Sequence, residues 1–240
     1  MDLTINVLDH GYVKLCETWG HGGDASGDLE AGVISAARQS TQGGFRGWDE
    51  DAKLLRYLYE HKHLTPFEFA GMVIEVQAPI FVFREWHRHR TQSFNEASAR
   101  YAPLPELYYQ PRFDNVLERS TMPSSTGNKQ AASVGPAATA TIVGDWLDQV
   151  EVAYVELERL YQQGLAAGIP KELARIVMPV GHYSRMRASA NLRNWLAFMT
   201  LRCDPAAQWE IRQFADAVSK LVEKTFPHTW VLWCEEFTRV

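Results

Sequence analysis

The sequence FAGMVIEVQAPIFVFREWHRHRTQSFNEASARY, residues 69–101, joins a long apolar run to the densest polar block of the chain. Only two polar side chains interrupt the apolar run over residues 69–83. This run predicts a strand over residues 69–77, and Pro79, a residue favoured at the start of a helix, predicts a short helix over residues 80–87. The polar block that follows is therefore attached directly to a core strand and helix.

The polar block, residues 88–101, contains three arginines, one histidine, one glutamate, one asparagine and two serines in fourteen residues. Arginine and glutamate are seldom buried unless paired, so the block forms either a solvated surface or a polar pocket. Its spacing follows neither the helical nor the strand period, and apolar residues flank it, which favours the pocket. Because arginine presents a flat fork of donors to phosphate or carboxylate, the block predicts a site for an anionic, planar ligand.

The composition is that of a soluble globular protein, with 46% hydrophobic and 22% charged residues among 240. This length can bury the core of a single domain over residues 1–240. A net charge of −5 leaves no broad basic surface, so no nucleic-acid partner is expected. The chain shows no membrane-spanning run and no signal pattern, and Cys16, Cys203 and Cys234 lack disulfide or metal spacing. These features predict a cytoplasmic protein that is not attached to a membrane.

The remaining periodicity predicts an α+β fold, with helices packed around a small, mainly antiparallel sheet. Prolines after Tyr101 predict an extended segment, and the Ser-, Thr-, Gly- and Ala-rich residues 120–139 predict a mobile surface loop. Asp28 is expected to cap the first helix. Further strands are predicted at residues 3–7, 12–19 and 180–190, and further helices at 28–38, 49–61, 138–168, 170–179, 191–201, 207–224 and 227–240.

Two local patterns leave alternatives open. The long helix after Ala138 has an apolar stripe that suits either the core or a contact between subunits. This stripe comprises Ile142, Trp146, Val150, Ala153, Leu157 and Leu160. His61 and His63 beside Glu68 could bind a metal, but no third or fourth ligand stands nearby in the sequence, which favours surface or ligand-contacting histidines and no metal.

The chain offers no evident covalent nucleophile. It contains no Gly-x-Ser-x-Gly elbow, no cysteine beside a histidine and no carboxylate cluster suited to a catalytic metal. An enzyme of this kind depends on positioning, electrostatics and a cofactor. The residues alone thus indicate a pocket for a phosphate-bearing ligand, and a noncatalytic nucleotide-binding module is an alternative to an enzyme.

The polar block also resembles a known family. Residues 88–100 match, position for position, the RHRxxSxNExSxR signature of the flavin-dependent thymidylate synthases. The segment HLTPFE, residues 63–68, is a second match, with Phe69 where the family usually has histidine. The resemblance extends over nearly the whole chain, and Ala197 stands where relatives often have Asn or His.

The resemblance implies that the chain methylates dUMP to dTMP, with methylenetetrahydrofolate as carbon donor and FAD, reduced by NADPH, as hydride source. It also implies a homotetramer with active sites shared between subunits. Residues at the family's FAD-binding positions are Thr65, Arg88, His89, Arg90, Glu96, Asn191 and Arg193. Residues at its nucleotide-binding positions are Glu85, Arg88, Ser98, Ala99, Arg100, Arg175 and Arg202. His63 and Tyr101 would line the face on which folate or nicotinamide stacks.

The resemblance assigns catalysis to Arg202, which would stabilise negative charge on the uracil ring. Ser98 is a rival nucleophile, but no histidine in the signature has the context of a triad base, so a hydrogen bond to the nucleotide is expected instead. Cys203 is the cysteine that could contradict this mechanism, because the adjacent Arg202 could lower the pKa of its thiol.

Overall fold

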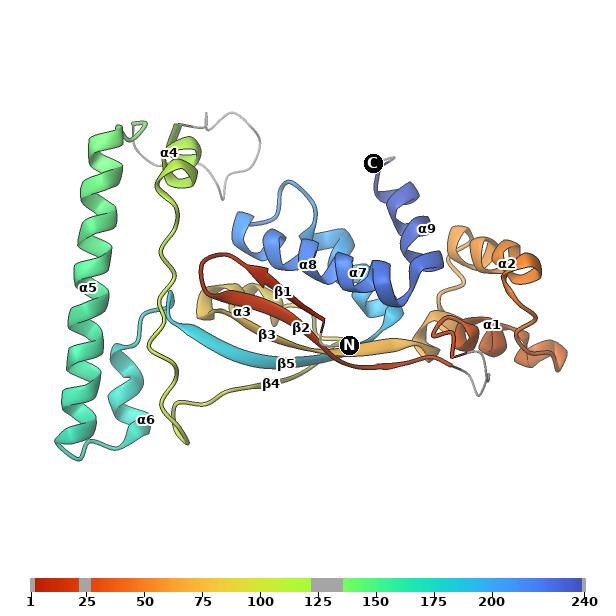
Figure 1. The fold of residues 1–240 in the computed structure, drawn as a ribbon, viewed down its shortest axis with the longest axis horizontal. Coiled ribbons are helices and arrows are strands. Elements are labelled where there is room, and N and C mark those ends of the chain that lie inside the picture. Colours follow the sequence, from red (N-terminus) through yellow and green to blue (C-terminus); the bar gives the residue numbers. More distant parts are fainter. Residues whose placement is uncertain (1–2, 22–26, 122–135, 239–240) are drawn as a thin grey trace.

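The computed structural model describes residues 3–21, 27–121 and 136–238. In this part of the chain, antiparallel strands form one sheet in the order β1-β2-β3-β5-β4, with helices around it (Figure 1). The predicted α+β class and antiparallel sheet are confirmed. The strands are β1 (Thr4–Val7), β2 (Gly11–Trp19), β3 (Gly71–Pro79), β4 (Ser93–Glu96) and β5 (Tyr183–Asn191).

Strand β3 lies at the centre of the sheet because its side chains alternate in character. Met72, Ile74 and Val76 are fully buried, whereas Glu75 and Gln77 on the opposite face are only partly buried. Residues i and i+2 of a strand point to the same face, so this alternation gives one apolar and one polar face. The strand begins two residues later than predicted because residues 65–69 form a 3₁₀ turn.

The apolar face of the sheet is covered by α3, α7 and α8, and α9 packs on α8 and α2. Helices α1 and α2 lie at one end of the molecule and α4, α5 and α6 at the other (Figure 1). The helices are α1 (Ala31–Arg38), α2 (Trp48–Glu60), α3 (Ile80–Trp86), α4 (Phe113–Thr121), α5 (Ala140–Ala166), α6 (Lys171–Ala174), α7 (Leu192–Arg202), α8 (Trp209–Thr225) and α9 (Pro227–Phe237).

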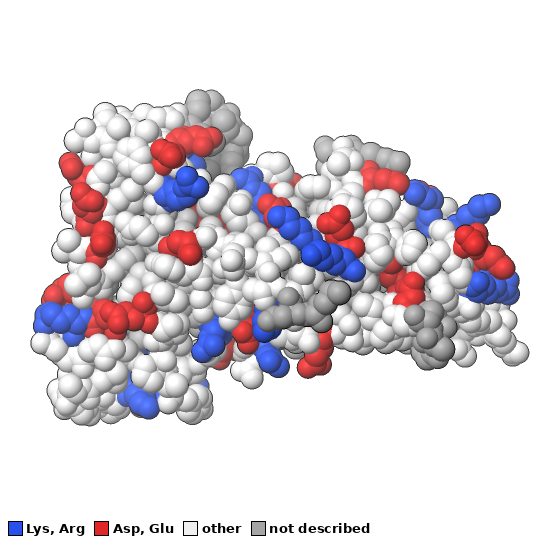
Figure 2. Space-filling model, in the orientation of Figure 1, with Lys and Arg blue, Asp and Glu red and all other residues white. Residues whose placement is uncertain are grey.

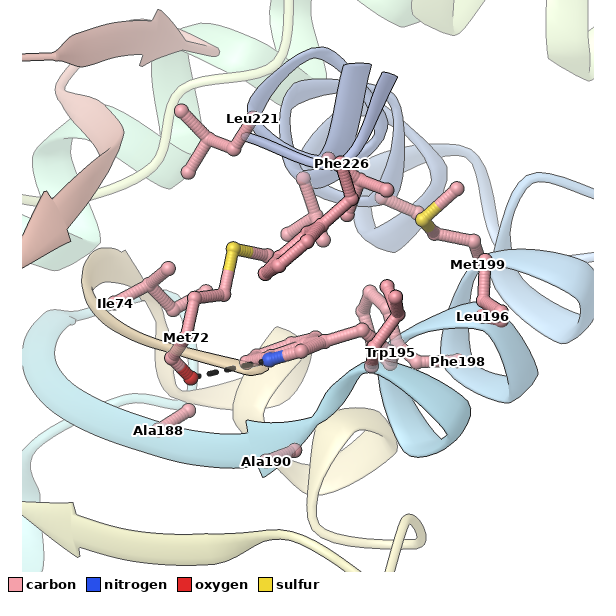
Figure 3. Close-up of a cluster of buried hydrophobic side chains, with 14 of the residues drawn as sticks. Met72, Ile74, Ala188, Ala190, Trp195, Leu196, Phe198, Met199, Leu221 and Phe226 are labelled. Atoms are coloured by element: carbon pink, nitrogen blue, oxygen red, sulfur yellow. Dashed lines mark hydrogen bonds between the residues drawn. The ribbon is translucent and has the colours of Figure 1, made fainter. Parts of the chain in front are cut away.

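The core forms where α7 and the end of α8 meet the sheet. Trp195 of α7 is fully buried against β3 and donates from Nε1 to the backbone oxygen of Met72 at 3.1 Å (Figure 3). The ring of Phe226, also fully buried, lies above it in the same view. Buried aromatic side chains of this size contribute strongly to stability, so α7 is held firmly on the sheet.

Several predicted elements differ in detail. Residues 93–96 form the edge strand β4 inside the polar block, where no strand period was recognised, because pairing with β5 supplies its hydrogen bonds. Helix α4 was not predicted. Residues 120–121 of the predicted loop end that helix, and residues 122–135 lie outside the described residues. Asp28 does not cap α1 as expected, since the cap position is Glu30, whose amide donates to Asp28 Oδ1 at 2.8 Å.

The helix predicted at residues 170–179 is also shorter than expected. Helix α6 ends at Ala174, and Arg175 begins a 3₁₀ turn that stops before Met178. Met178 is extended because it precedes Pro179, and a residue before proline avoids the helical region. The following strand accordingly begins at Tyr183 instead of residue 180.

Helix α5 exposes much of its predicted apolar stripe. Ile142, Trp146 and Leu160 are 57%, 50% and 44% exposed, whereas Val143 and Leu147 are buried. The core alternative is therefore wrong for those three exposed side chains. They remain available for a contact with another chain.

Charged side chains of both signs are interspersed on the face of the molecule that Figure 2 shows, without a continuous basic surface. Among the described residues, no helix combines the length and apolarity that would be needed to cross a membrane.

Candidate active site

Arg202, the last residue of α7, is almost buried, with 9% of its surface exposed. Its Nε donates to Nε2 of His89 at 2.9 Å, and its Nη1 donates to Oε2 of Glu85 at 2.9 Å. Its Nη2 donates to the backbone oxygen of Glu85, also at 2.9 Å. The guanidinium group is thus held in one orientation, with a second N–H on each Nη atom still available to a ligand.

The turn after α3 places His89 beside α7. The amide of His89 donates to the backbone oxygen of Trp86 at 3.0 Å, and the indole of Trp86 donates to Oε1 of Gln92 at 3.0 Å. Phe198, one turn before Arg202, stacks on Trp86 with ring centroids 4.6 Å apart and meets the edge of His89 at 4.8 Å. Buried aromatic packing therefore fixes both sides of the contact between His89 and Arg202.

The imidazole of His89 is neutral. Burial lowers the pKa of His89 to about 4, the positive charge of Arg202 acts in the same direction, and Glu85 opposes both. A neutral imidazole has one nitrogen without a proton. That nitrogen is Nε2, because it accepts the hydrogen bond from the guanidinium.

Arg88 and Arg90, on either side of His89 in the sequence, are exposed. Their amides are held by the turn, since Arg88 N donates to Glu85 O at 3.3 Å and Arg90 N donates to Arg88 O at 3.1 Å. Within the described ranges, their guanidinium groups make no hydrogen bond or ion pair. Two unpaired guanidinium groups on a fixed turn are well suited to phosphate oxygens.

The start of α7 lies against the 3₁₀ turn Thr65–Phe69. Asn191 caps the helix, and Arg193 in its first turn forms an ion pair with Glu68 of that turn. Asn194 Nδ2 donates at 3.2 Å to a backbone oxygen of the polar block. Helix α7 thus connects Thr65, Asn191 and Arg193 at its start with Arg202 at its end.

The second half of the polar block lies against α6. Lys171 Nζ donates to the backbone oxygen of Tyr101 at 3.1 Å, and Arg100 N and Nε donate to Ser98 Oγ at 3.4 and 3.3 Å. Arg100 and Tyr101 line an open cleft of about 400 Å³ together with Pro170, Lys171 and Glu172. Arg175 Nε donates to the backbone oxygen of Glu172 at 3.4 Å, which places a further cation beside this cleft.

The site residues therefore fall into two groups. The α7 group comprises Thr65, Glu85, Arg88, His89, Arg90, Asn191, Arg193 and Arg202. The α6 group comprises Ser98, Ala99, Arg100, Tyr101, Lys171 and Arg175. Helix α6 lies beside α5 at one end of the molecule, whereas α7 lies over the sheet (Figure 1). Among the described residues, no hydrogen bond or ion pair joins the two groups, so the candidate site residues do not form one continuous cluster.

Glu96 and His63 belong to neither the α7 group nor the α6 group. Glu96 is on β4, opposite Met186 of β5, and connects the two halves of the polar block. His63 is exposed after α2, with its ring 5.8 Å from the ring of Tyr57. Tyr101 of the α6 group is 78% exposed, with the guanidinium of Arg100 5.4 Å from its ring centroid.

Residues 24–228 match the family model described as thymidylate synthase complementing protein. The chain belongs to this family. A flavin-dependent thymidylate synthase of Thermus thermophilus is 38% identical over 239 residues, covering 97% of this chain and 79% of that one. Another, of Dictyostelium discoideum, is 35% identical over 233 residues, covering 97% and 73%. The predicted resemblance to the flavin-dependent thymidylate synthases is confirmed, and the chain is an enzyme of this type.

A solved structure supports the same assignment of the fold. The crystal structure of the UMP/dUMP methylase PolB from Streptomyces cacaoi, bound with 5-Br dUMP, matches with a TM-score of 0.79 at 30% identity. The match covers 96% of this chain and 97% of that chain. This chain and PolB thus share one architecture.

The pKa of the Cys203 thiol is not lowered by the adjacent Arg202. Burial, followed by the negative charge of Asp216, raises the pKa of the Cys203 thiol to about 12. The guanidinium of Arg202 makes its contacts with Glu85 and His89 instead. Cys203 is therefore a protonated packing residue at physiological pH.

The sequence did not indicate that Lys171 lines the cleft beside Arg100, nor that Glu68 forms an ion pair with Arg193. Lys171 precedes Arg175 by four residues, a spacing that places two side chains on the same face of a helix, and this was the available signal. The pairing of Glu68 with Arg193 joins segments that are distant in the sequence, so no local pattern indicates it. The two departures from the family pattern, Phe69 and Ala197, are both exposed.

The described residues contain no group of three or more His, Cys, Asp or Glu side chains that could hold a metal ion.

Proposed function

We propose that this enzyme catalyses the reductive methylation of dUMP to dTMP. Methylenetetrahydrofolate would supply the carbon, and FAD, reduced by NADPH, would supply the hydride. The observation that carries the proposal is Arg202, whose guanidinium is held by Glu85 and His89 with N–H groups left for a ligand. The names of the relatives, and the 5-Br dUMP bound to PolB, support the choice of substrate.

The chemistry that Arg202 can perform follows from its setting. A planar guanidinium donates to a ring nitrogen and a neighbouring carbonyl oxygen at once, and these are the groups of uracil that carry the negative charge of its ionised imide, the form in which the C5 carbon is the better nucleophile. Because the guanidinium is almost buried and already oriented, little reorganisation accompanies the development of this charge. Arg202 would therefore activate the nucleotide without a covalent nucleophile from the protein.

The α7 group fits a flavin dinucleotide. The pyrophosphate of a flavin dinucleotide binds to clustered cations. Arg88 and Arg90 are exposed, their backbone is fixed by a turn, and their guanidinium groups are unpaired among the described residues. When bound, the flavin would supply the hydride that converts the transferred methylene group into a methyl group. The other proposed FAD contacts are Thr65, His89, Glu96, Asn191 and Arg193.

The α6 group fits the phosphate of the nucleotide. Arg100 and Lys171 line one cleft, and Arg175 adds a third cation through its hydrogen bond to the backbone of Glu172, which also lines it. The hydroxyl of Ser98 and the backbone at Ala99 add neutral groups. Glu85, Arg88 and Arg202 would contact the same nucleotide from the α7 group. The exposed rings of His63 and Tyr101 would line the face for folate or nicotinamide.

Because these two groups are separated in one chain, we propose a homotetramer in which each active site combines the α7 group of one subunit with the α6 group of another. The exposed apolar side chains of α5 and the segment after it favour such an association. They are Ile142, Trp146, Val152, Val155, Leu160, Ile169, Leu173, Ile176 and Val180. A cytoplasmic location is proposed with this biosynthetic role.

The test is to purify the protein, record its visible absorption spectrum and titrate FAD into the flavin-free form. The protein is then incubated with dUMP, NADPH and methylenetetrahydrofolate labelled with ¹³C in the methylene group. We expect dTMP that carries the label, together with NADPH oxidation that depends on dUMP. Saturable binding of dUMP without dTMP formation, under conditions where FAD is bound, would instead favour a noncatalytic nucleotide-binding module.

A further inference from the structure

The hydrogen bond between Arg202 and His89 can form in only one direction. Arg202 Nε carries a hydrogen at every accessible pH, so at 2.9 Å it must donate and His89 Nε2 must accept. The proton of the neutral imidazole therefore lies on Nδ1. Glu85 holds the two Nη atoms, and His89 is the acceptor for Nε.

We propose that His89 is a positioning residue for Arg202, in which the neutral imidazole fixes the rotation of the guanidinium that activates the nucleotide. This inference rests on the proposed function and adds to it, because the resemblance assigns His89 only to flavin binding. The imidazole acts through Arg202 and need not touch the substrate.

Three features make His89 suited to this role. Its ring packs edge-on against Phe198, with the ring centroids 4.8 Å apart, and this contact helps to keep the acceptor nitrogen beside Arg202. The charged groups that face the imidazole are Arg202 from α7 and Glu85 from α3, and a protonated imidazole would repel the former. Without an acceptor, the Nε–H of Arg202 would be buried and unsatisfied, which favours other rotamers of this side chain.

The removal of this acceptor should affect the chemical step more than binding. Glu85 would still retain the guanidinium near the nucleotide, so the KM for dUMP should change little. The orientation of the two free N–H groups would be lost, and a displacement of about 1 Å can lower a rate by about 100-fold. The expected signature is a fall in kcat at saturating dUMP and FAD.

The experiment compares His89→Phe, which keeps the ring but lacks an acceptor, with His89→Gln, whose amide oxygen can accept. Kd for FAD, KM for dUMP and kcat at saturating FAD are measured separately. We expect kcat to fall by about 100-fold in His89→Phe and to recover by at least about tenfold in His89→Gln. In an Arg202→Ala background, His89→Phe should lower kcat little further, because His89 acts only through the guanidinium that Arg202→Ala has already removed.

His87→Phe is the matched control. His87 lies two residues away, with its Nε2 3.2 Å from Met186 Sδ, and makes no contact with Arg202 among the described residues. It should leave kcat within about twofold of the unmodified enzyme. If His89→Phe does not fold, His89→Asn replaces it, since the shorter amide does not reach the guanidinium.

Two results would overturn the inference. One is a His89→Phe enzyme that binds FAD more weakly but has an unchanged kcat at saturation. The other is a fall in kcat that is additive with Arg202→Ala. If the unmodified protein makes no dTMP, the proposed function fails, and the contact is still tested by ¹⁵N spectra of labelled arginine. There the slowly exchanging Nε–H of Arg202 should disappear in His89→Phe and persist in His89→Gln.

Discussion

Glu30 caps a helix that lies almost two hundred residues further along the chain: its Oε1 accepts a hydrogen bond of 2.7 Å from the amide of Thr229. Its Oε2 accepts a second, of 2.9 Å, from the amide of His228. Both amides belong to the first turn of α9, whose free N–H groups need acceptors. Glu30 thereby joins the segment before α1 to the last helix of the chain.

The burial of Glu30 makes the stability of the enzyme depend on pH. Burial raises the pKa of this carboxyl from 4.5 to about 7, although the hydrogen bonds from Thr229 and His228 oppose the shift. Between these two values the folded protein holds a proton that the unfolded chain releases. Protonation therefore favours the folded state, and the free energy of unfolding should fall as pH rises from 4.5 through 7, by up to about 3 kcal/mol.

This prediction is measured by urea unfolding between pH 5 and 8 at one protein concentration, because an oligomer's stability depends on concentration. Glu30→Gln, which cannot ionise, should remove most of the dependence in this window. Glu118→Gln, which alters an exposed carboxylate on α4, serves as the control and should keep the slope of the unmodified protein. An equal slope in Glu30→Gln would show that another group is responsible.

Arg175 and Arg202 should differ in their kinetic effects. A phosphate contact is made equally in the ground state and the transition state, so Arg175→Ala should raise the KM for dUMP and leave kcat close to normal. The partner of Arg202 gains charge during the reaction, so Arg202→Ala should lower kcat by about 100-fold or more. Steady-state kinetics at saturating FAD measure both. An unchanged kcat in Arg202→Ala would contradict its activating role.

The division of the site into two groups predicts complementation between inactive chains. Arg202→Ala damages the α7 group and Arg100→Ala the α6 group, so each variant is impaired at subsaturating dUMP. If each site combines two chains, random mixing of the two variants restores about a quarter of the sites. At any one site the α7 group is intact with a probability of about one half, and so, independently, is the α6 group. Co-expression with two affinity tags isolates the mixed oligomers. Sites built within one chain would show no recovery.

The sequence predicted the parts of this fold that depend on local patterns. The apolar run over residues 69–83, interrupted only by Glu75 and Gln77, predicts β3, and the structure buries one face of that strand. Strand β4 could not be recognised in this way, since it is an edge strand and its hydrogen bonds depend on β5, nearly a hundred residues later. The predicted helix at residues 170–179 extends too far, because Pro179 keeps Met178 out of the helical conformation.

The candidate site shows the same limit. The signature places Arg88, His89 and Arg100 in one block, and the resemblance assigns their ligands. The structure adds that the block divides between two groups, because β4 carries its second half away towards α6. That separation, and the acceptance of a hydrogen bond from Arg202 by His89, are tertiary contacts that no spacing in the sequence indicates.

The last prediction concerns the absence of a protein nucleophile. A cysteine can attack the uracil ring only as a thiolate. With a pKa of about 12, Cys203 would be a thiolate in about one molecule in ten thousand at pH 8. Burial also raises the pKa of Cys234, and Cys16 lies in β2 at the irregular pairing between Leu15 and Glu17. All three are suited to packing.

A variant in which Cys16, Cys203 and Cys234 are all replaced by alanine should therefore retain most of its turnover. Folding is checked by circular dichroism and flavin content by absorbance, because the loss of partly buried sulfur atoms lowers stability. dTMP formation is then measured at saturating dUMP. A folded, flavin-replete triple variant without turnover, with the loss reproduced by Cys203→Ala alone, would establish a covalent cysteine mechanism. Retained turnover leaves Arg202, oriented by Glu85 and His89, as the group that activates the nucleotide.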